Sequence, residues 1–153
     1  MSPEKRIAIG SDHAAAPVKD RLVKHLRDNG WEVKDFTVLV EGKADYPVAG
    51  YDVATAVANG EFPQGVLLCG TGLGMSYVAN RVPGIRAALC TTKEFATLSR
   101  EHNDANILVM PGRATIQDPH EEILDVWLAT PFSGDERHVK RIHMIDHPDC
   151  ANG

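Results

Sequence analysis

The sequence predicts an α/β protein of three layers, in which helices cover both faces of a five-stranded parallel sheet. Short apolar runs alternate with stretches of helical spacing, which is the pattern of strand–helix–strand units. The runs are apolar throughout and do not alternate with polar residues, as expected for strands buried on both faces. With 153 residues, the chain has the size of one domain with one core.

Five strands are predicted where apolar runs are bounded by polar residues or glycines. They are Ile7–Gly10, Trp31–Val33, Gly65–Cys69, Ile85–Leu89 and Asn106–Met110. The structured core is expected over about residues 6–146 of a single domain that spans residues 1–153, with a frayed tail over residues 147–153.

A helix is predicted after each strand, together with an extra helix near the C-terminus. The first helix begins near Ala15, because Pro17 fits only a first turn, and a left-handed cap at Asn29-Gly30 ends it. The run Asp118-Pro119-His120-Glu121 is typical of a helix start, with an aspartate as N-cap and a glutamate that closes a capping box. The other predicted helices contain Val53–Ala58, Met75–Asn80, Lys93–His102 and Asp135–Ile145, and Asp45-Tyr46-Pro47 is predicted to lie in a loop.

Composition excludes several classes of function. A formal net charge of −5 argues against non-specific binding of nucleic acid, which needs a broad basic surface. No apolar stretch approaches the ~20 residues that span a bilayer, so no membrane partner is expected. The three cysteines, Cys69, Cys90 and Cys150, form no CxxC pair, and free thiols fit a reducing compartment, so we expect a cytoplasmic protein.

Polar residues follow three of the predicted strands. Asp12 and His13 follow the first, Cys69 and a glycine-rich turn end the third, and Arg113 follows the fifth. Open parallel sheets bind ligands at the carboxyl ends of their strands, so these side chains are expected on one rim. The turn Gly70-Thr71-Gly72-Leu73-Gly74 has neither dinucleotide-binding nor P-loop spacing. It predicts either an anion or oxyanion site or only a tight turn.

Three groups of residues are open to a chemical or a structural interpretation. Cys69, beside glycine amides and a helix N-terminus, could serve as a base or nucleophile, or be a small buried apolar residue. His102 could be a proton donor or a polar helix cap. Arg137 and Arg141 share a helix face and could bind a phosphate or only face solvent. The pair His143 and His147 lacks further ligands, and no metal site is predicted.

Several motifs occur together in the order of a known family. They are Gly10-Ser11-Asp12-His13, Asp45-Tyr46-Pro47, Cys69-Gly70-Thr71-Gly72-Leu73-Gly74-Met75-Ser76, Ala79-Asn80-Arg81-Val82-Pro83-Gly84-Ile85-Arg86-Ala87 and Ser99-Arg100-Glu101-His102-Asn103-Asp104-Ala105-Asn106. On these motifs the chain resembles the type B ribose-5-phosphate isomerase family, which also includes galactose-6-phosphate isomerase subunits. The resemblance covers nearly the whole chain, from Ile7 to about Ile145.

The resemblance implies a Rossmann-like (flavodoxin-like) domain and an enzyme that needs neither metal nor cofactor. It implies aldose–ketose isomerisation of a phosphorylated sugar, with D-ribose 5-phosphate and D-ribulose 5-phosphate as the expected pair. In such enzymes a base moves a proton between C1 and C2 through a cis-enediolate. The resemblance also implies a homodimer with active sites at the subunit interface, with a tetramer as the alternative, and a place in the pentose phosphate pathway.

The resemblance further assigns roles to individual residues. One branch of the family has a cysteine base at the position of Cys69, and another has a glutamate at the position of Met75, so the chain looks like the cysteine branch. The implied catalytic residues are Cys69, Thr71, His102 and Asp12. The residues implied to bind substrate are His13, Tyr46, Gly70, Gly72, Gly74, Asn103, Arg113, Arg137 and Arg141, part of the phosphate-binding set coming from the neighbouring subunit.

The chain departs from the family pattern at two places that bear on the sugar. The family usually has Asp-His-Ala-Gly where this chain has Asp12-His13-Ala14-Ala15, and Gly-Gly-Arg-His where it has Asp135-Glu136-Arg137-His138. A tetrose or hexose phosphate, such as an erythrulose, allose or galactose phosphate, therefore stays open as substrate. A non-catalytic sugar-phosphate-binding subunit is a second alternative, and a flavin or nucleotide binder, suggested by fold alone, is a third.

Overall fold

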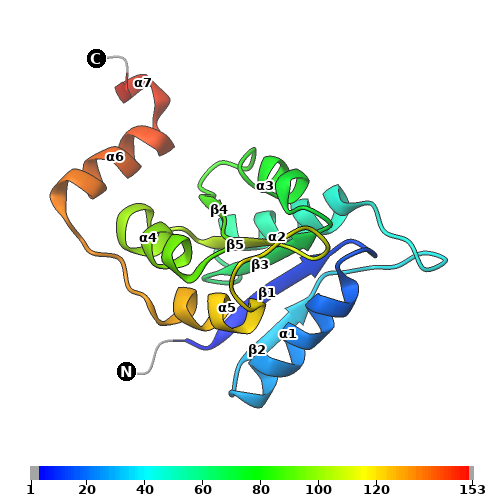
Figure 1. Ribbon diagram of the computed structural model, residues 1–153. Helices are drawn as coiled ribbons and strands as arrows, with labels where there is room; N and C mark the ends of the chain where they lie inside the picture. Colours follow the sequence, from blue (N-terminus) through cyan, green and yellow to red (C-terminus); the bar gives the residue numbers. More distant parts are fainter. Residues whose placement is uncertain (1–3, 152–153) are drawn as a thin grey trace.

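Five parallel strands form the central sheet, in the order β2–β1–β3–β5–β4 (Figure 1). The structure is a computed structural model and describes residues 4–151. The strands are β1 (Arg6–Ser11), β2 (Glu32–Asp35), β3 (Gly65–Cys69), β4 (Ala87–Leu89) and β5 (Ile107–Pro111). The predicted fold class is confirmed. The strand order departs from the 2-1-3-4-5 order of flavodoxin only at the far edge, where β5 lies between β3 and β4.

Helices cover both faces of this sheet. They are α1 (Ala16–Asp28), α2 (Tyr46–Ala58), α3 (Leu73–Ala79), α4 (Lys93–Asn103), α5 (His120–Ala129), α6 (Glu136–Asp146) and α7 (Pro148–Ala151). Leu22 of α1 and Trp127 of α5 pack on one face, and Val53 of α2 and Met75 of α3 pack on the other. The three-layer core follows from strands with apolar side chains on both faces.

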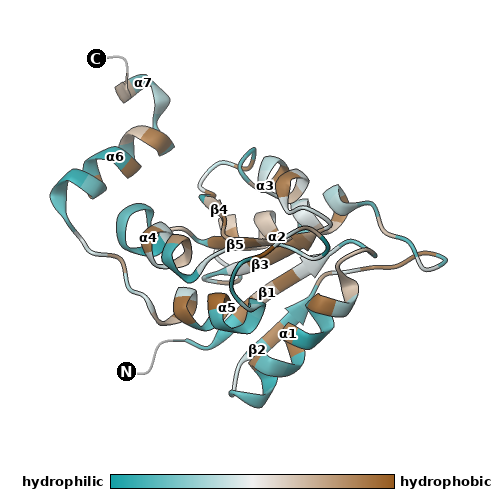
Figure 2. Cartoon of the chain, viewed as in Figure 1, coloured by the Kyte–Doolittle hydropathy of each residue, from teal (hydrophilic) through white to brown (hydrophobic). Residues whose placement is uncertain are grey.

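Helix α6 leaves the layered body and extends away from it (Figure 1). Hydrophobic positions concentrate in the central strands, but some lie on α6 as well (Figure 2). Val139 is 50% exposed and Ile145 is 56% exposed. A helix with uncovered apolar residues has little core of its own, so its position depends on a few contacts.

One predicted helix start is wrong in its chemistry. The carboxylate of Asp118 accepts a hydrogen bond from the backbone N–H of Lys93 at 2.7 Å, so it caps α4. Helix α5 begins at His120 with Pro119 as its N-cap residue and has no side-chain cap. The cause is tertiary, because the Thr91 carbonyl accepts the N–H groups of Gln117 and Asp118 and so holds this segment against the start of α4.

Two further segments are helical where none was predicted. Helix α2 begins at Tyr46, with Pro47 in its first turn, so Asp45-Tyr46-Pro47 is a helix start and not a loop. The chain after His147, predicted to be frayed, forms the short helix α7, and residues 152–153 lie outside the described range. No helix within residues 4–151 is both long and apolar enough to cross a membrane.

Candidate active site

Asp12 and His13 lie where β1 ends and α1 is about to begin. Asp12 is 9% exposed, and its Oδ1 accepts a hydrogen bond from the N–H of Ala15 at 2.9 Å. The Nδ1 of the exposed His13 lies 3.2 Å from both the backbone nitrogen and the carbonyl oxygen of Ala44. The two side chains line a cleft of about 550 Å³, which is completed by the Ala44–Val48 segment at the start of α2.

The glycine-rich turn after β3 permits two close approaches. Gly72 has φ of +80°, a left-handed conformation that glycine adopts without strain, and a Cβ there would lie 2.6 Å from Leu89. A Cβ on Gly74 would lie 2.5 Å from Cζ of Tyr46, so the Tyr46 ring rests on the turn itself. The exposed Thr71 accepts a hydrogen bond from the N–H of Leu73 at 3.1 Å. The turn therefore adjoins the cleft through Tyr46.

Backbone hydrogen bonds tie the β5 end to the β3 end. Cys69 pairs with Pro111, and its carbonyl accepts the N–H of Gly112 at 2.8 Å. The Gly70 carbonyl accepts the N–H of Arg113 at 2.9 Å, which fixes where the exposed Arg113 leaves the sheet. The thiol-bearing Cys69 is only 4% exposed. It lies between the turn and the Arg113 loop.

The same edge therefore holds most of the site residues expected from the sequence. We call this set the carboxyl-edge group; it consists of Asp12, His13, Tyr46, Cys69, Gly70, Thr71, Gly72, Gly74 and Arg113. A carboxylate, an imidazole, a thiol and a guanidinium lie around loops that touch one another, since a Cβ on Gly112 would lie 2.5 Å from the Ala15 side chain. The guanidinium and the imidazole of such a set can bind an anionic ligand, and the thiol and the carboxylate can transfer protons to and from the ligand's carbon and oxygen atoms.

Sequence reasoning missed a buried histidine behind this edge. His120 is 9% exposed, and its Nε2–H donates to the Pro111 carbonyl at 2.7 Å. The ring holds the last residue of β5 in place, directly before Gly112 and Arg113. No local pattern marks it, since His120 lies in what reads as an ordinary helix start.

Four expected site residues lie elsewhere in the chain. We call them the α4–α6 group; it consists of His102, Asn103, Arg137 and Arg141. Helix α4 ends just before β5, so His102 and Asn103 lie at the amino edge of the sheet. Cys69 lies opposite Pro111, four residues beyond Ile107, so roughly 13 Å along the sheet separates the two edges. One chain therefore does not bring its own His102 and Asn103 to its own Cys69.

A pair of neighbouring histidine rings connects α4 to α6. The rings of His102 and His138 have centroids 4.5 Å apart and planes inclined by 35°. His138 is 7% exposed, and its Nδ1 lies 3.0 Å from Oγ of Ser133. Burial lowers the pKa of His138, and electrostatic repulsion from the neighbouring His102 and Arg137 side chains lowers it further. The neutral form of His138 is therefore favoured in the folded chain.

Metal ligation finds no support among the described residues. Over residues 4–151, no cluster of three histidine, cysteine, aspartate or glutamate side chains has an arrangement that could hold a metal ion. His143 and His147 do lie together, with ring centroids 4.2 Å apart.

Comparison with known proteins places the chain in a family. The family model described as Ribose/Galactose Isomerase matches residues 7–145. The chain is 41% identical over 141 residues to ribose-5-phosphate isomerase B of Escherichia coli, which covers 92% of this chain and 94% of that protein. It is 36% identical to the D-erythrulose-4-phosphate isomerase of Pectobacterium atrosepticum, over 94% of this chain and 96% of that protein.

Solved structures agree with this placement. The crystal structure of a ribose 5-phosphate isomerase from Thermotoga maritima has a TM-score of 0.88 and 46% identity, and the match covers 94% of this chain and 99% of that one. Sequence and structure thus agree over almost the full length of both proteins. The chain belongs to the ribose/galactose isomerase family and is an enzyme of the isomerase class.

Proposed function

We propose that this protein interconverts D-ribose 5-phosphate and D-ribulose 5-phosphate, with Cys69 as the general base. The observation that carries the proposal is the junction of the β1, β3 and β5 ends. There Cys69 lies between the glycine-rich turn and Arg113, close to the cleft lined by Asp12 and His13. This is the arrangement that proton transfer on a phosphorylated sugar needs.

The proposed chemistry moves one proton between neighbouring carbons. The Cys69 thiolate removes the proton from C2 of the open-chain aldose, which leaves a cis-enediolate. The proton then returns to C1, while the proton of the C2 hydroxyl is transferred to O1, and the ketose results. Thr71 and the amides of Gly70–Gly74 stabilise the enediolate oxygen, because hydrogen-bond donors held in advance favour the charge that develops there. Asp12 and His102 assist ring opening. No atom of this scheme calls for a metal or a cofactor.

Substrate binding is divided among the remaining residues. Tyr46 and Asn103 orient the sugar. The phosphate is bound by His13, Arg113, Arg137 and Arg141, since guanidinium groups match the geometry of phosphate oxygens.

We propose that each active site takes its α4–α6 group from a second subunit of a homodimer, with a tetramer as the alternative. Two observations support this. His102 and Asn103 lie at the sheet edge opposite Cys69, and α6 extends away from the body with Val139 and Ile145 uncovered. In a dimer with twofold symmetry, each subunit contributes its α4–α6 group to the active site of the other. Free Cys69, Cys90 and Cys150 support the proposed location in the cytoplasm.

One of the two departures from the family pattern does not reach the sugar-binding cleft. Ala15, which stands where the family usually has glycine, is fully buried beside Gly112 and does not line the cleft. This departure therefore adds no side chain to the sugar-binding space. Tetrose and hexose phosphates remain the alternative substrates, in line with the D-erythrulose-4-phosphate isomerase among the relatives.

The test is a panel of tetrose, pentose and hexose phosphates assayed for aldose–ketose conversion with a chelator present. We expect the highest kcat/KM for ribose 5-phosphate, and near-complete loss of turnover in Cys69→Ala with binding of the sugar phosphate retained. Cys69→Ala turnover near the wild-type rate would remove Cys69 as the base. Binding without turnover of any sugar phosphate would favour the non-catalytic subunit.

A further inference from the structure

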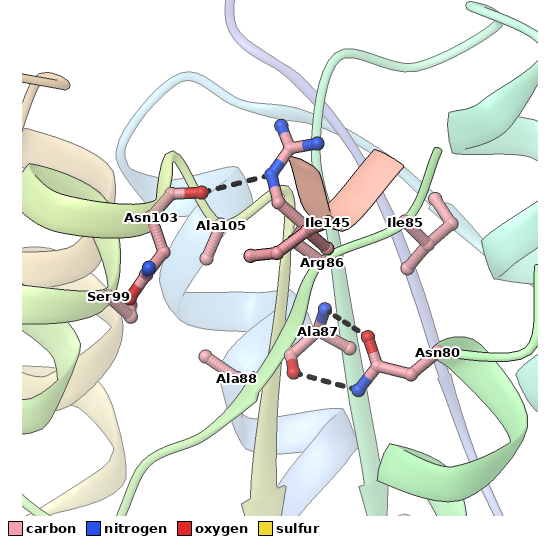
Figure 3. A pocket seen from close by; sticks show the side chains of 9 residues that line it. All are labelled: Asn80, Ile85, Arg86, Ala87, Ala88, Ser99, Asn103, Ala105 and Ile145. Atoms are coloured by element: carbon pink, nitrogen blue, oxygen red, sulfur yellow. Dashed lines mark hydrogen bonds between the residues drawn. The ribbon is translucent and has the colours of Figure 1, made fainter. Parts of the chain in front are cut away.

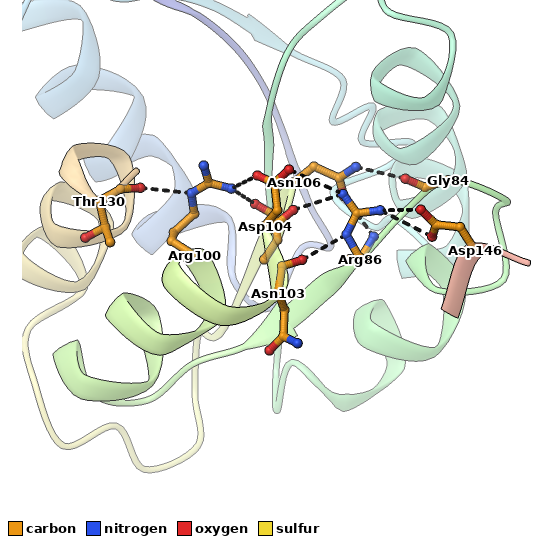
Figure 4. Close-up of polar contacts among 9 residues, drawn as sticks. Gly84, Arg86, Arg100, Asn103, Asp104, Asn106, Thr130 and Asp146 are labelled. Atoms are coloured by element: carbon orange, nitrogen blue, oxygen red, sulfur yellow. Dashed lines mark hydrogen bonds and ion pairs between the residues drawn. The ribbon is translucent and has the colours of Figure 1, made fainter. Parts of the chain in front are cut away.

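Arg86, in the loop before β4, binds the C-terminal end of α4. Its Nε donates to the carbonyl of Asn103 at 2.9 Å, and its Nη2 donates to the carbonyl of Asp104 at 3.1 Å (Figure 4). The last carbonyls of a helix have no partner within the helix, so the guanidinium satisfies groups that would otherwise be open. The side chain of Arg86 is 16% exposed, which limits competition from water.

The other end of the same guanidinium binds α6. Nη1 of Arg86 donates to both carboxylate oxygens of Asp146, at 3.2 Å and 2.9 Å (Figure 4). Charge-assisted hydrogen bonds of this kind are about twice as strong as neutral ones. Asp146 is the last residue of α6, so the contact holds the end of that helix.

The backbone of Arg86 is itself held in place. Its N–H donates to Oδ1 of Asn106 at 2.8 Å, and Nδ2 of Asn106 donates to the Gly84 carbonyl at 2.9 Å. On the far side of the α4 end, Nη1 of Arg100 donates to Oδ1 of Asp104 at 2.8 Å. Arg86 therefore acts from a fixed loop on a fixed helix end, whereas α6 is the element that needs positioning.

Apolar packing alone does not fix α6 at this end. A pocket of about 380 Å³ separates α6 from the body, with Ile145 of α6 on one side and Ala88 and Ala105 on another (Figure 3). Because space remains beneath Ile145, dispersion contacts hold the helix only weakly there. At the other end of α6, the ring of His138 packs against the ring of His102. The Arg86–Asp146 pair thus links one end of α6 to the body through polar contacts, and the two histidine rings link the other end.

We propose that Arg86 and Asp146 form a brace that sets the α4–α6 group in the geometry in which it enters an active site. Arg86 fixes the helix end that carries His102 and Asn103, and through Asp146 it fixes the helix that carries Arg137 and Arg141. Neither Arg86 nor Asp146 belongs to the proposed catalytic or substrate-binding set, so both act as positioning residues. The inference rests on the proposed function for its catalytic consequences, but the position of α6 is measurable without turnover.

The two partners of the brace have separable effects. Asp146→Asn releases α6 and leaves Arg86 on the α4 carbonyls, so we expect KM for ribose 5-phosphate to rise about fivefold with kcat within about twofold of wild type. Arg86→Lys keeps a positive charge for Asp146 but loses the planar fork on Asn103 and Asp104, so we expect kcat to fall about fivefold. Asp146→Glu keeps the carboxylate and is expected to recover most of the wild-type KM.

The experiment compares these variants in the intact protein with Asp28→Asn, which removes an exposed aspartate of an ion pair on α1. Steady-state kinetics are combined with hydrogen exchange of the α6 backbone amides. The brace predicts exchange of these amides about fivefold faster in Asp146→Asn than in Asp28→Asn. Equal exchange in the two variants would overturn the brace whatever the activity. Faster exchange in a protein that isomerises no sugar phosphate would retain the brace and overturn the proposed function.

Discussion

The ring of Tyr46 lies against the backbone of Gly74, which makes Gly74→Ala a sharp probe of the site. A Cβ at this position would lie 2.5 Å from Cζ, 2.7 Å from Cε2 and 2.9 Å from Oη of Tyr46. Ordinary carbon–carbon contacts begin near 3.5 Å, so the substitution must displace the ring by on the order of 1 Å. The displaced ring would change the shape of the cleft that Asp12 and His13 line.

The effects of Gly74→Ala on stability and activity should differ in size. Alanine is the better residue for α3 by up to about 1 kcal/mol, and overpacking costs about 1–3 kcal/mol. Because Tyr46 is 38% exposed, its ring can move into solvent, and we expect the free energy of unfolding to fall by less than about 2 kcal/mol. Under the proposed role of Tyr46 in orienting the sugar, a displacement of about 1 Å should lower kcat/KM by on the order of 10-fold to 100-fold.

The assay is a double-mutant cycle of Gly74→Ala and Tyr46→Ala, read by kcat/KM for ribose 5-phosphate and by urea unfolding. Because the added methyl acts through the ring, Gly74→Ala should change kcat/KM little once Tyr46 is alanine. Losses that simply add, or a wild-type kcat/KM in Gly74→Ala, would refute this reasoning.

Three further predictions concern titration, thiol reactivity and helix capping. Burial, followed by nearby positive charge, lowers the pKa of His138, so the unfolded chain binds protons more readily and the free energy of unfolding falls as pH drops below about 6.5. In His138→Asn the free energies of unfolding in urea at about pH 7.5 and about pH 5.5 should differ less than in the wild type, and a variant that shows the full wild-type difference would contradict this. Burial raises the pKa of Cys90 to about 11, so iodoacetamide at about pH 8 should label the exposed Cys150 and reach Cys90 only in urea; equal labelling of both thiols in the native protein would be inconsistent with this. Asp118→Ala removes the acceptor of the Lys93 N–H at the start of α4, so the free energy of unfolding in urea should fall by about 1 kcal/mol while kcat stays unchanged. An unchanged free energy of unfolding would contradict this capping role.

Local patterns predict much of the fold because local physics decides it. The apolar run of β3 and the glycines after it predict a strand that passes through a turn into a helix, and the structure has β3 followed by α3. The start of α2 at Tyr46 was wrongly predicted to be a loop, although Pro47 in a first turn is a local signal of a helix start. Periodicity does not encode strand pairing, and so the place of β5 between β3 and β4 was not predictable from it.

Tertiary contacts decide what local patterns cannot. Asp118 has the chemistry of an N-cap, but the helix it caps is α4 and not the one that follows it in sequence. All members of the carboxyl-edge group except Tyr46 could be predicted from the strand ends, because every parallel strand of the sheet points its carboxyl end the same way. The role of Arg86 could not, because its partners Asn103 and Asp146 are distant in sequence and meet only in the fold.

We propose that one active site combines Cys69 of one subunit with His102 of another. The test is the activity of mixed dimers of Cys69→Ala and His102→Ala chains, purified after co-expression with two different tags. Each purified mixed dimer would contain one complete site and one site that lacks both residues, so it should recover about half of the wild-type activity per dimer toward ribose 5-phosphate. Purified mixed dimers that stay as inactive as the two parent proteins would contradict the shared site.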